Sequence, residues 1–480
     1  MRVLLVTGRL AYPVVKSVAG KAADVIMLDI GVAAFVTPKL LEEAIKDKAE
    51  DYDLVLVTGL SSSDFSGLEN KLGVKIRLGP KHAFDIPLAL QYADKIEFSH
   101  KVSACQLLAN IKRENAIKDY ERLEEEAAPE FMLKGVKIGW TSTMKVMAEV
   151  VDATKLSDVD LIKKIDSYAS ADIIDLGVPL DSTPEAVMHA VKVARSATFK
   201  PISIDTLIPE YIEAGIEAGA NMVLSLNGSN IDMIGNLIAE KDIPAVVIPD
   251  DETLESLCVN IQKCKDIGIE HIVADPVLSP VGHGAVESLE RYIDFRKEHA
   301  GMPLFFGVGN ITELIDADSI GVNALLAGFA MELDASILFT TEHSQKAINS
   351  ADELKKACMM MALAKERKGP VKDLGIDLLV IKEKRPRKDL IEPGRVIEAK
   401  RHEWMTDPKG SFNIFIDNGT IYAKNGDITI AGKDAGPIMH TIIDRGLVSR
   451  LDHMGYLGAE LMKAELAIRF NRTYLQDDRF

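Results

Sequence analysis

The chain of 480 residues is 47% hydrophobic and 27% charged, a composition that is typical of folded globular proteins and excludes a disordered or fibrous chain. At this length we expect about two to four domains, each able to bury its own core. The 73 acidic residues outnumber the 56 Lys and Arg residues, and the formal charge of -17 disfavours a surface that neutralises nucleic-acid phosphates.

The apolar segments predict neither an export signal nor a membrane helix. The first apolar run ends at Gly8 and Arg9 after a few residues, and no later stretch reaches the ~20 apolar residues that a membrane helix needs. The four cysteines form no CxxC pair and no cluster with zinc spacing. We therefore expect a cytoplasmic protein without disulfides, structural zinc, nucleic-acid contacts or membrane contacts.

Residues 1–140 predict an N-terminal α/β domain of the doubly wound type. Three short apolar runs are separated by segments long enough for helices, which is typical of βαβ units. These runs lie at residues 3–7, 24–29 and 53–59. A long polar helix is expected over 101–128, and we expect it to pack across this domain or to bridge to the next one.

Residues 141–368 predict a central (β/α)8 TIM barrel. Eight apolar strand candidates alternate with helical patterns over roughly 220 residues, which is close to the minimum for this fold. The candidates are residues 145–152, 172–177, 200–205, 221–226, 244–249, 271–276, 302–307 and 322–327. Thr183 and Thr253 stand where helix N-caps are expected. An open doubly wound sheet is the alternative, but such sheets usually have fewer strands.

Residues 369–402 predict a basic linker, and residues 403–480 a small C-terminal α+β domain. We expect the linker to be solvated, and binding of an anionic substrate tail or a partner is the alternative. Beyond it, the Asn-Gly pairs at 418–419 and 425–426 predict a β-meander. A final helix is expected to dock on this sheet through an apolar stripe, which consists of Leu457, Leu461, Ala464 and Ile468.

Acidic and amide side chains recur at the carboxyl ends of the predicted barrel strands, where the active sites of TIM barrels lie. They are Asp152, Asp175, Asp205, Asn227, Asp275 and Asn310. Because Asp and Asn are poor strand formers, their repetition at this register indicates a site, although each Asp alone could be a helix N-cap. A pocket rich in acceptors suits a flat heterocycle with N–H groups, and a carboxylate cluster could instead hold Mg²⁺ or Mn²⁺.

Four short motifs in this segment together resemble the pterin-binding TIM barrels, the family of dihydropteroate synthases and pterin-dependent methyltransferases. In chain order they are ISIDT (202–206), the Asn227 of SLNGSN, ADP (274–276) and GVGN (307–310). The resemblance implies that Asp205, Asn227, Asp275 and Asn310 hydrogen-bond the pterin ring. With its α/β leader and small C-terminal domain, the whole chain resembles the archaeal dihydropteroate synthase-related proteins. That resemblance implies a place in tetrahydromethanopterin or related pterin metabolism.

Three basic motifs of dihydropteroate synthases are missing from the segments where we expect them. LGVPLDSTPE follows the second predicted strand without the family's Arg, while GVGNIT and LLAGFAMELD replace a Ser-Arg-Lys and an Arg-x-His motif. In the family these groups receive a diphosphate leaving group and orient an arylamine. His283 and Lys155 could supply part of a phosphate site, or could be surface loop residues. Asp152 and Asp175 are further candidates for the pocket.

The leading hypothesis is a dihydropteroate synthase-like transferase that couples a pterin methylene carbon to an arylamine or to another, anionic second substrate. Catalysis would rest on position and charge, with Mg²⁺ as an optional cofactor. A pterin-dependent methyltransferase acting on a corrinoid or another acceptor is the alternative, although the Asp-x-His-x-x-Gly motif of corrinoid domains is missing. A non-catalytic pterin carrier or sensor is the third hypothesis. A homodimer is one option for the assembly.

Overall fold

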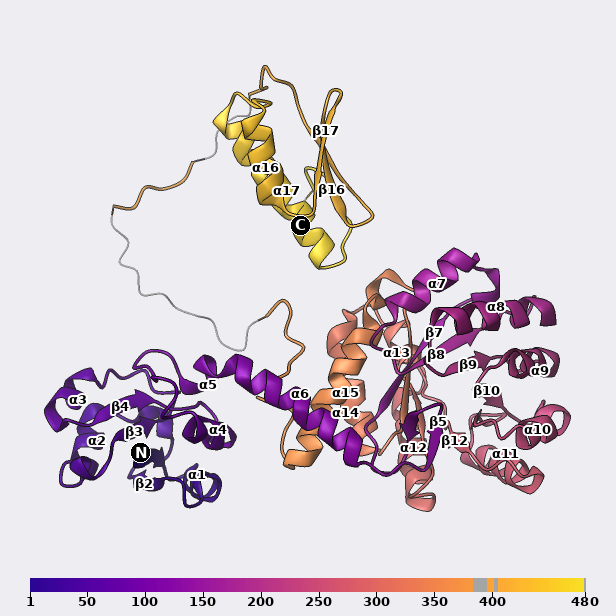
Figure 1. The fold of residues 1–480 in the computed structure, drawn as a ribbon, viewed down its shortest axis with the longest axis horizontal. Coiled ribbons are helices and arrows are strands. Elements are labelled where there is room, and N and C mark those ends of the chain that lie inside the picture. The colour runs from indigo at the N-terminus through magenta and orange to yellow at the C-terminus, as the bar shows by residue number, and fades with distance from the viewer. Residues whose placement is uncertain (383–394, 401–404, 479–480) are drawn as a thin grey trace. The chain divides into compact units, whose positions relative to one another are not determined.

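The computed structural model describes residues 1–382, 395–400 and 405–478 (Figure 1). The chain divides into two compact units, residues 1–380 and 381–480. In the described part, no helix is both long enough and apolar enough to span a membrane. The domain boundaries placed at residues 140, 368 and 402 stay predictions, and residues 383–394 and 401–404 of the predicted basic linker lie outside the described residues.

The first unit begins with a four-stranded parallel sheet of order β2-β1-β3-β4. The strands are β1 (Val3–Gly8), β2 (Asp24–Leu28), β3 (Leu54–Val57) and β4 (Lys75–Leu78). The first three match the predicted apolar runs. β4 was not predicted, because Lys75 and Arg77 interrupt its apolar pattern, as is common in an edge strand.

Helices cover both faces of this sheet, which confirms the doubly wound prediction. On one face α1 (Tyr12–Ala19) and α4 (Ile86–Gln91) pack on Leu5 and Leu56. On the other face α2 (Pro38–Ile45) and α3 (Ser66–Leu72) contribute to the core that holds the alternate strand residues. This two-sided burial explains why the strands read as continuous apolar runs rather than as an alternation.

The predicted long helix bridges two cores. It is interrupted once, giving α5 (Ala104–Leu107) and α6 (Ala109–Glu126). Leu108 and Ile111 belong to the core of the N-terminal sheet, whereas Ala116 packs with residues of α15 (Ser350–Arg367) in a separate cluster. The helix therefore joins the N-terminal sheet to the last helix of the following barrel (Figure 1).

The second part of this unit is a (β/α)8 barrel, as predicted. Its parallel strands run in the order β12-β11-β10-β9-β8-β7-β14-β13, and a parallel bridge between Ala274 and Leu304 joins the two ends. The strands are β7 (Lys145–Val150), β8 (Ile173–Gly177), β9 (Ile202–Asp205), β10 (Met222–Leu226), β11 (Ala245–Val247), β12 (Ile272–Ala274), β13 (Phe305–Gly307) and β14 (Ile337–Thr341).

The barrel helices lie between the strands in the chain and surround them in space (Figure 1). They are α7 (Asp158–Ser167), α8 (Pro184–Ala197), α9 (Pro209–Ala218), α10 (Ile231–Glu240), α11 (Leu254–Ile267), α12 (Ala285–Glu298), the short α13 (Gly309–Thr312), α14 (Ser319–Glu332) and α15. Two predicted caps are confirmed: Thr183 Oγ1 accepts from Ala186 N and Thr253 Oγ1 from Ser256 N, both at 3.2 Å.

The predicted position of the eighth strand is wrong. Residues 322–327 lie in the middle of α14, and the strand is β14, ten or more residues later in the chain. In α14 the buried residues Asn323, Leu326 and Ala330 recur at helical spacing. A short apolar run does not distinguish a buried helix from a strand, and here the run belongs to the helix.

Successive side chains along each barrel strand point alternately toward the helices and toward the inside of the barrel, which gives the barrel an outer core and an inner core. On β7, Val146, Ala148 and Val150 face the helices, whereas Met147 and Glu149 point toward the inside of the barrel. The hairpin of β5 (Phe131–Leu133) and β6 (Val136–Ile138) packs its apolar side chains on the inner core. The inner residues of the barrel are therefore mainly apolar toward the amino ends of the strands, and the carboxylates lie toward the carboxyl ends.

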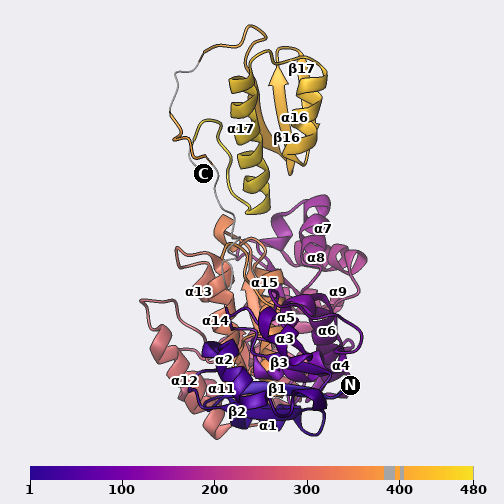
Figure 2. The same cartoon turned by 90° about the vertical axis from the view of Figure 1, so that its left-hand side faces the viewer.

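The second unit contains the predicted meander and its docked helix (Figure 2). Strands β15 (Asn413–Asp417), β16 (Thr420–Asn425) and β17 (Ile428–Gly432) pair antiparallel around the two Asn-Gly turns. Helices α16 (Ala435–Asp444) and α17 (Leu451–Arg469) share one core with one face of this sheet. The predicted apolar stripe on α17 lies in that core.

Replacement of Leu461 by Ala tests this docking. Leu461 is fully buried, so its truncation should lower the free energy of unfolding of the C-terminal unit by about 2–5 kcal/mol. The neighbouring Met462 is 46% exposed, and Met462→Ala should change it by less than about 0.5 kcal/mol. Urea unfolding of the full chain measures both, and equal effects of the two substitutions would contradict the docking.

Candidate functional site

Three carboxylates from adjacent strands meet at the carboxyl end of the barrel. Glu149 of β7 lies opposite Asp175 of β8 in the strand register, and Gly177 of β8 lies opposite Asp205 of β9. One oxygen from each of the three carboxylates lies within 4.8 Å of the others. Across the described residues, none of the three forms an ion pair with Lys or Arg. No Lys or Arg among the described residues therefore compensates these carboxylates.

Asp175 is the most constrained member of the cluster. Its side chain is fully buried, and Ser203 donates a hydrogen bond to Oδ1, while Oδ2 is buried without any partner. Burial, followed by repulsion from Asp205 and Glu149, raises the pKa of Asp175 well above its ordinary value. An unpartnered buried carboxylate oxygen is costly, so we infer that it holds a proton or meets a ligand.

Glu149 fits beside Asp175 because residue 177 is glycine. A Cβ atom on Gly177 would lie only 2.3 Å from Glu149 Oε1. Burial is the main cause that raises the pKa of Glu149 to about 8, and repulsion from Asp205 and Asp152 adds to it. The sequence analysis missed Glu149, although the two-residue alternation from Met147 would have placed it inside the barrel.

Asp205 and Asp275 form the other side of the site. Burial and then repulsion from Asp275 raise the pKa of Asp205 to about 7. Burial raises the pKa of Asp275 to about 6, against the opposing effect of a hydrogen bond from Tyr292. Tyr292 Oη lies 2.6 Å from Asp275 Oδ1, and the backbone N–H of Val277 donates to the same oxygen at 2.8 Å.

Arg291 of α12 supports the loop that follows Asp275, and the sequence analysis did not identify it. Its guanidinium donates to the carbonyl oxygens of Pro276 and Val277, at 3.3 and 2.9 Å. It also lowers the pKa of Asp275 through its charge. Its spacing from Asp275 in the sequence gave no signal, since the contact depends on how α12 packs against β12.

The two predicted asparagines lie at the same end of the barrel, Asn227 on a loop and Asn310 in the short helix α13. Asn227 follows β10, and its Oδ1 accepts hydrogen bonds from the N–H and the hydroxyl of Ser229. Asn310 follows β13, and its Nδ2 donates to the carbonyl oxygen of Leu278 at 2.8 Å. Asn227 Nδ2 and Asn310 Oδ1 have no hydrogen-bond partner in the described part of the chain, which leaves one donor and one acceptor available.

The remaining candidates are less closely joined to the carboxylates. Asp152 stands in a left-handed turn after β7, with φ of 51°, where its charge acts on Glu149. His283 is exposed on the loop between β12 and α12, and its side chain forms no ion pair with any described residue. Lys155 pairs with Asp181 at 2.9 Å on the surface. The described contacts therefore do not join His283 and Lys155 into a phosphate site.

The corrected position of β14 changes the comparison with the Arg-x-His motif. LLAGFAMELD lies in α14 and the turn after it, whereas the residues at the end of the strand are Thr341, Glu342 and His343. No Arg or Lys stands among these three residues.

Chemically, the cluster of Glu149, Asp175 and Asp205 can take up protons, N–H donors or a hard cation. Its oxygens are the ligand type that Mg²⁺ and Mn²⁺ prefer, and the unpartnered Asp175 Oδ2 is a free ligand atom. Hydrogen-bond donors on a heterocycle would satisfy the same oxygens. The donor set therefore fits both a cation and a flat ligand rich in N–H groups.

Replacement of Glu149 by Gln tests whether the Glu149 carboxylate is protonated in the folded protein. A folded-state pKa of about 8, against an ordinary value of about 4.3, means that the folded protein binds a proton that the unfolded chain has released. The free energy of unfolding of the wild type should therefore fall between about pH 5 and pH 8. Relative to Glu149→Gln, the fall should be on the order of 2 kcal/mol.

Urea unfolding at several pH values measures this difference. Glu240→Gln, at an exposed position of α10, is the matched control and should follow the wild type. Parallel curves for wild type and Glu149→Gln would show that Glu149 is ionised in the folded protein.

Comparisons with known proteins give the chain a family. A family model described as PterinBD-DUF4346 matches residues 406–477. The chain is 25% identical over 185 residues to the dihydropteroate synthase of Clostridium beijerinckii, covering 32% of this chain and 68% of that protein. A solved structure of Yersinia pestis DHPS with a pterine–sulfa conjugate aligns with 47% of this chain and 95% of its own, with a TM-score of 0.38 and 17% identity.

One relative is matched along almost its whole length. The chain is 38% identical over 516 residues to the "Uncharacterized protein MJ0107" of Methanocaldococcus jannaschii, with 99% of this chain and 98% of that protein covered. The chain therefore belongs to the same family as that protein, the archaeal dihydropteroate synthase-related family that the sequence motifs indicated.

Proposed function

We propose that the protein binds a pterin at the carboxyl end of its barrel and acts as a dihydropteroate synthase-like transferase. It would couple a pterin methylene carbon to an arylamine in tetrahydromethanopterin- or folate-type metabolism, in the cytoplasm. The observation that carries this proposal is the group of carboxylates Glu149, Asp175, Asp205 and Asp275, of which the first three pair with no described Lys or Arg. Membership of the archaeal dihydropteroate synthase-related family supports it.

The charges of the site suit the polar edge of a pterin. The ring carries N–H and amino donors, and a carboxylate that accepts from them in a buried site forms charge-assisted hydrogen bonds. Asp205 and Asp275 bind these donors in this scheme. Asn227 and Asn310 complete the rim with the available Nδ2 and Oδ1 atoms, so that the ring edge is held on both sides.

Coupling to an arylamine needs no nucleophilic side chain. The arylamine nitrogen forms a bond to the methylene carbon, the bond from that carbon to its oxygen leaving group breaks, and the nitrogen loses a proton. Holding the two reactants in line supplies a large part of the acceleration. Stabilisation of the departing anion is the difficult step here, because no Arg or Lys among the described residues pairs with the cluster. Mg²⁺ held by Glu149, Asp175 and Asp205 would supply that positive charge.

Pterin-dependent methyl transfer is the second candidate, and one observation favours it. The transfer begins with a protonated pterin N5, and the raised pKa values of Asp205 and Glu149 place protons in the site near neutral pH. Asn310 would hold the N5 region. A non-catalytic pterin carrier would use the same binding residues without either reaction.

Isothermal titration with three pterins tests the proposal. The panel is 6-hydroxymethyl-7,8-dihydropterin, its diphosphate ester and a methylated tetrahydropterin. Asp275→Asn should raise the Kd of each bound pterin about 10- to 100-fold, because a charge-assisted hydrogen bond is lost. Asp232→Asn, at an exposed position of α10, should leave the Kd unchanged.

The order of affinities separates the hypotheses. Preference for the diphosphate ester supports the transferase, and preference for the methylated pterin supports methyl transfer. No binding, or equal Kd values for wild type and Asp275→Asn, would contradict the assignment of the pterin site.

Addition of Mg²⁺ to the protein without pterin tests the cation site. The ion must displace protons from Glu149, Asp175 and Asp205, so its stabilising effect should grow as the pH rises from about 6 to about 8. Thermal unfolding measures this as a larger rise of Tm at the higher pH. The rise should disappear in Glu149→Gln and persist in Glu240→Gln, and a rise of equal size in all three proteins would place the ion elsewhere.

A further inference from the structure

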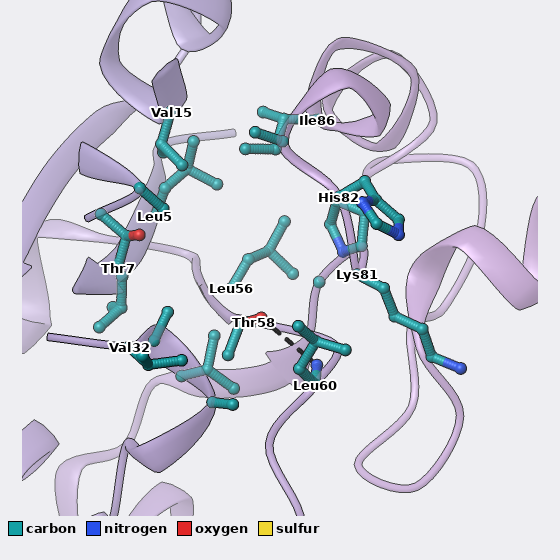
Figure 3. A pocket seen from close by; sticks show the side chains of 18 of the residues that line it. Leu5, Thr7, Val15, Val32, Leu56, Thr58, Leu60, Lys81, His82 and Ile86 are labelled. Atoms are coloured by element: carbon teal, nitrogen blue, oxygen red, sulfur yellow. Dashed lines mark hydrogen bonds between the residues drawn. The ribbon is translucent and has the colours of Figure 1, made fainter. Parts of the chain in front are cut away.

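The N-terminal sheet carries a cavity of its own, which the barrel chemistry does not use (Figure 3). It lies at the carboxyl ends of β1 and β3 and has a volume of about 190 Å³. The loops that follow β1, β2, β3 and β4 line it, at residues 10–11, 31–34, 58, 60 and 79–83. We call it the N-terminal cleft.

The topology of the sheet places this cleft where doubly wound proteins bind ligands. The strand β1 lies between β2 and β3, and the connections from β1 to β2 and from β3 to β4 run in opposite directions across the sheet. The helices of these two connections, α1 and α3, lie on opposite faces. The loops therefore separate at the ends of β1 and β3 and leave a crevice, which is the usual ligand site in such folds.

The walls of the cleft are mainly aliphatic. Leu5 and Leu56, which are opposite each other on β1 and β3, line it together with Val15 and Ile86 from the flanking helices. At the rim, Leu10 is 77% exposed, and Val32 and Leu60 are also exposed. A bound apolar group would remove these rim side chains from water.

A few polar groups face the same space (Figure 3). Thr7 is buried in β1, and its hydroxyl forms no hydrogen bond with any residue that the structure describes. Thr58 Oγ1 accepts from the N–H of Leu60, which leaves the hydroxyl proton available for donation. An aliphatic cleft with a small number of convergent polar groups is the typical form of a small-molecule site.

The rim also carries an uncompensated positive charge. Lys81 lines the cleft, with its ammonium directed away from Thr7 and Leu56 in Figure 3, and forms no ion pair within residues 1–382, 395–400 and 405–478. Arg9, in the loop after β1, is paired with Asp29 at 3.1 Å, and the rim residue His82 is paired with Asp373. The cleft therefore favours an anionic group at its mouth, the opposite preference from the acidic barrel site.

We propose that the N-terminal cleft is a second ligand site and that it binds a small aromatic molecule with one anionic substituent. The volume is below the usual range of about 300–1,000 Å³ for drug-sized ligands, so it fits one ring system. A rigid ring fills the aliphatic walls with little loss of conformational entropy. The anionic substituent lies at Lys81, and the hydroxyls of Thr7 and Thr58 bind polar atoms of the ring.

The test uses the full chain, methyl-labelled at Leu and Val, and three probes matched in size. Benzoate has the ring and the charge, cyclohexanecarboxylate has the charge without an aromatic ring, and benzyl alcohol has the ring without the charge. Benzoate should bind most tightly and should shift the methyl signals of Leu10, Leu60 and Val32 in NMR spectra. Binding of none of the probes, or shifts confined to other methyl groups, would overturn the proposal.

Two substitutions, at the half-buried Lys81 and the exposed Lys46, test whether the charge of Lys81 contributes to binding. Lys81→Ala should raise the Kd of benzoate about three- to fivefold and leave that of benzyl alcohol unchanged. Lys46→Ala, which removes the same charge at the end of α2, should change neither value. Equal effects of the two substitutions would refute the role of Lys81, and equal affinity for benzoate and cyclohexanecarboxylate would refute the aromatic preference.

A substitution in the barrel tests whether benzoate binds in the N-terminal cleft or in the barrel site. Asp205→Asn should not change the affinity for benzoate, because Asp205 belongs to the other site. A change in that variant would place the probe in the barrel and overturn the proposal. Failure of the pterin titration would leave this result unaffected, so the two proposals can fail separately.

Discussion

The barrel depends on one electrostatic constraint, which is the placement of Glu149, Asp175 and Asp205 together in a closed sheet, where no Lys or Arg among the described residues pairs with them. An ionised carboxylate in such a place loses its hydration and repels its neighbours, so protons, hydrogen bonds or a ligand must neutralise it. The layers below are apolar, and the hairpin of β5 and β6 packs on them. Their burial stabilises the barrel enough to hold an unfavourable group of charges at its carboxyl end.

The carboxylates differ in their hydrogen-bond donors across the site, and their pKa values differ as well. Asp275 accepts from Tyr292 and from the N–H of Val277, and its pKa rises only to about 6. Glu149 has no such donor in the described residues, and its pKa rises to about 8. At neutral pH the β12 side of the site is therefore mainly ionised and accepts hydrogen bonds, whereas the β7 side retains protons and can donate them. A heterocycle with donors on one edge and acceptors on the other would be oriented by this difference.

The sequence predicted the elements whose burial pattern is unambiguous and missed those that depend on tertiary packing. Seven barrel strands were recognised because strands covered on both faces read as apolar runs, and the C-terminal meander because Asn-Gly turns fix its register. The apolar run at 322–327 misled, since α14 is buried on much of its surface. In the site, Asp175, Asp205 and Asp275 were found from their position at the carboxyl end of a predicted strand. Glu149 lies earlier in its predicted strand, where the two-residue alternation was the available signal, and the part of Arg291 on α12 depends on tertiary packing.

The lack of basic residues near the carboxylates bears on the raised pKa of Glu149. Thr341 lies opposite Glu149 in the register of β14 and β7, and its Oγ1 is buried without a partner. A cation at this position would lie beside Glu149 and favour the ionised carboxylate. Thr carries no charge, so nothing at position 341 opposes the rise in the pKa of Glu149. Any anion that leaves during a reaction here must then be neutralised by a positive group that binds to the carboxylates. A divalent cation meets that condition.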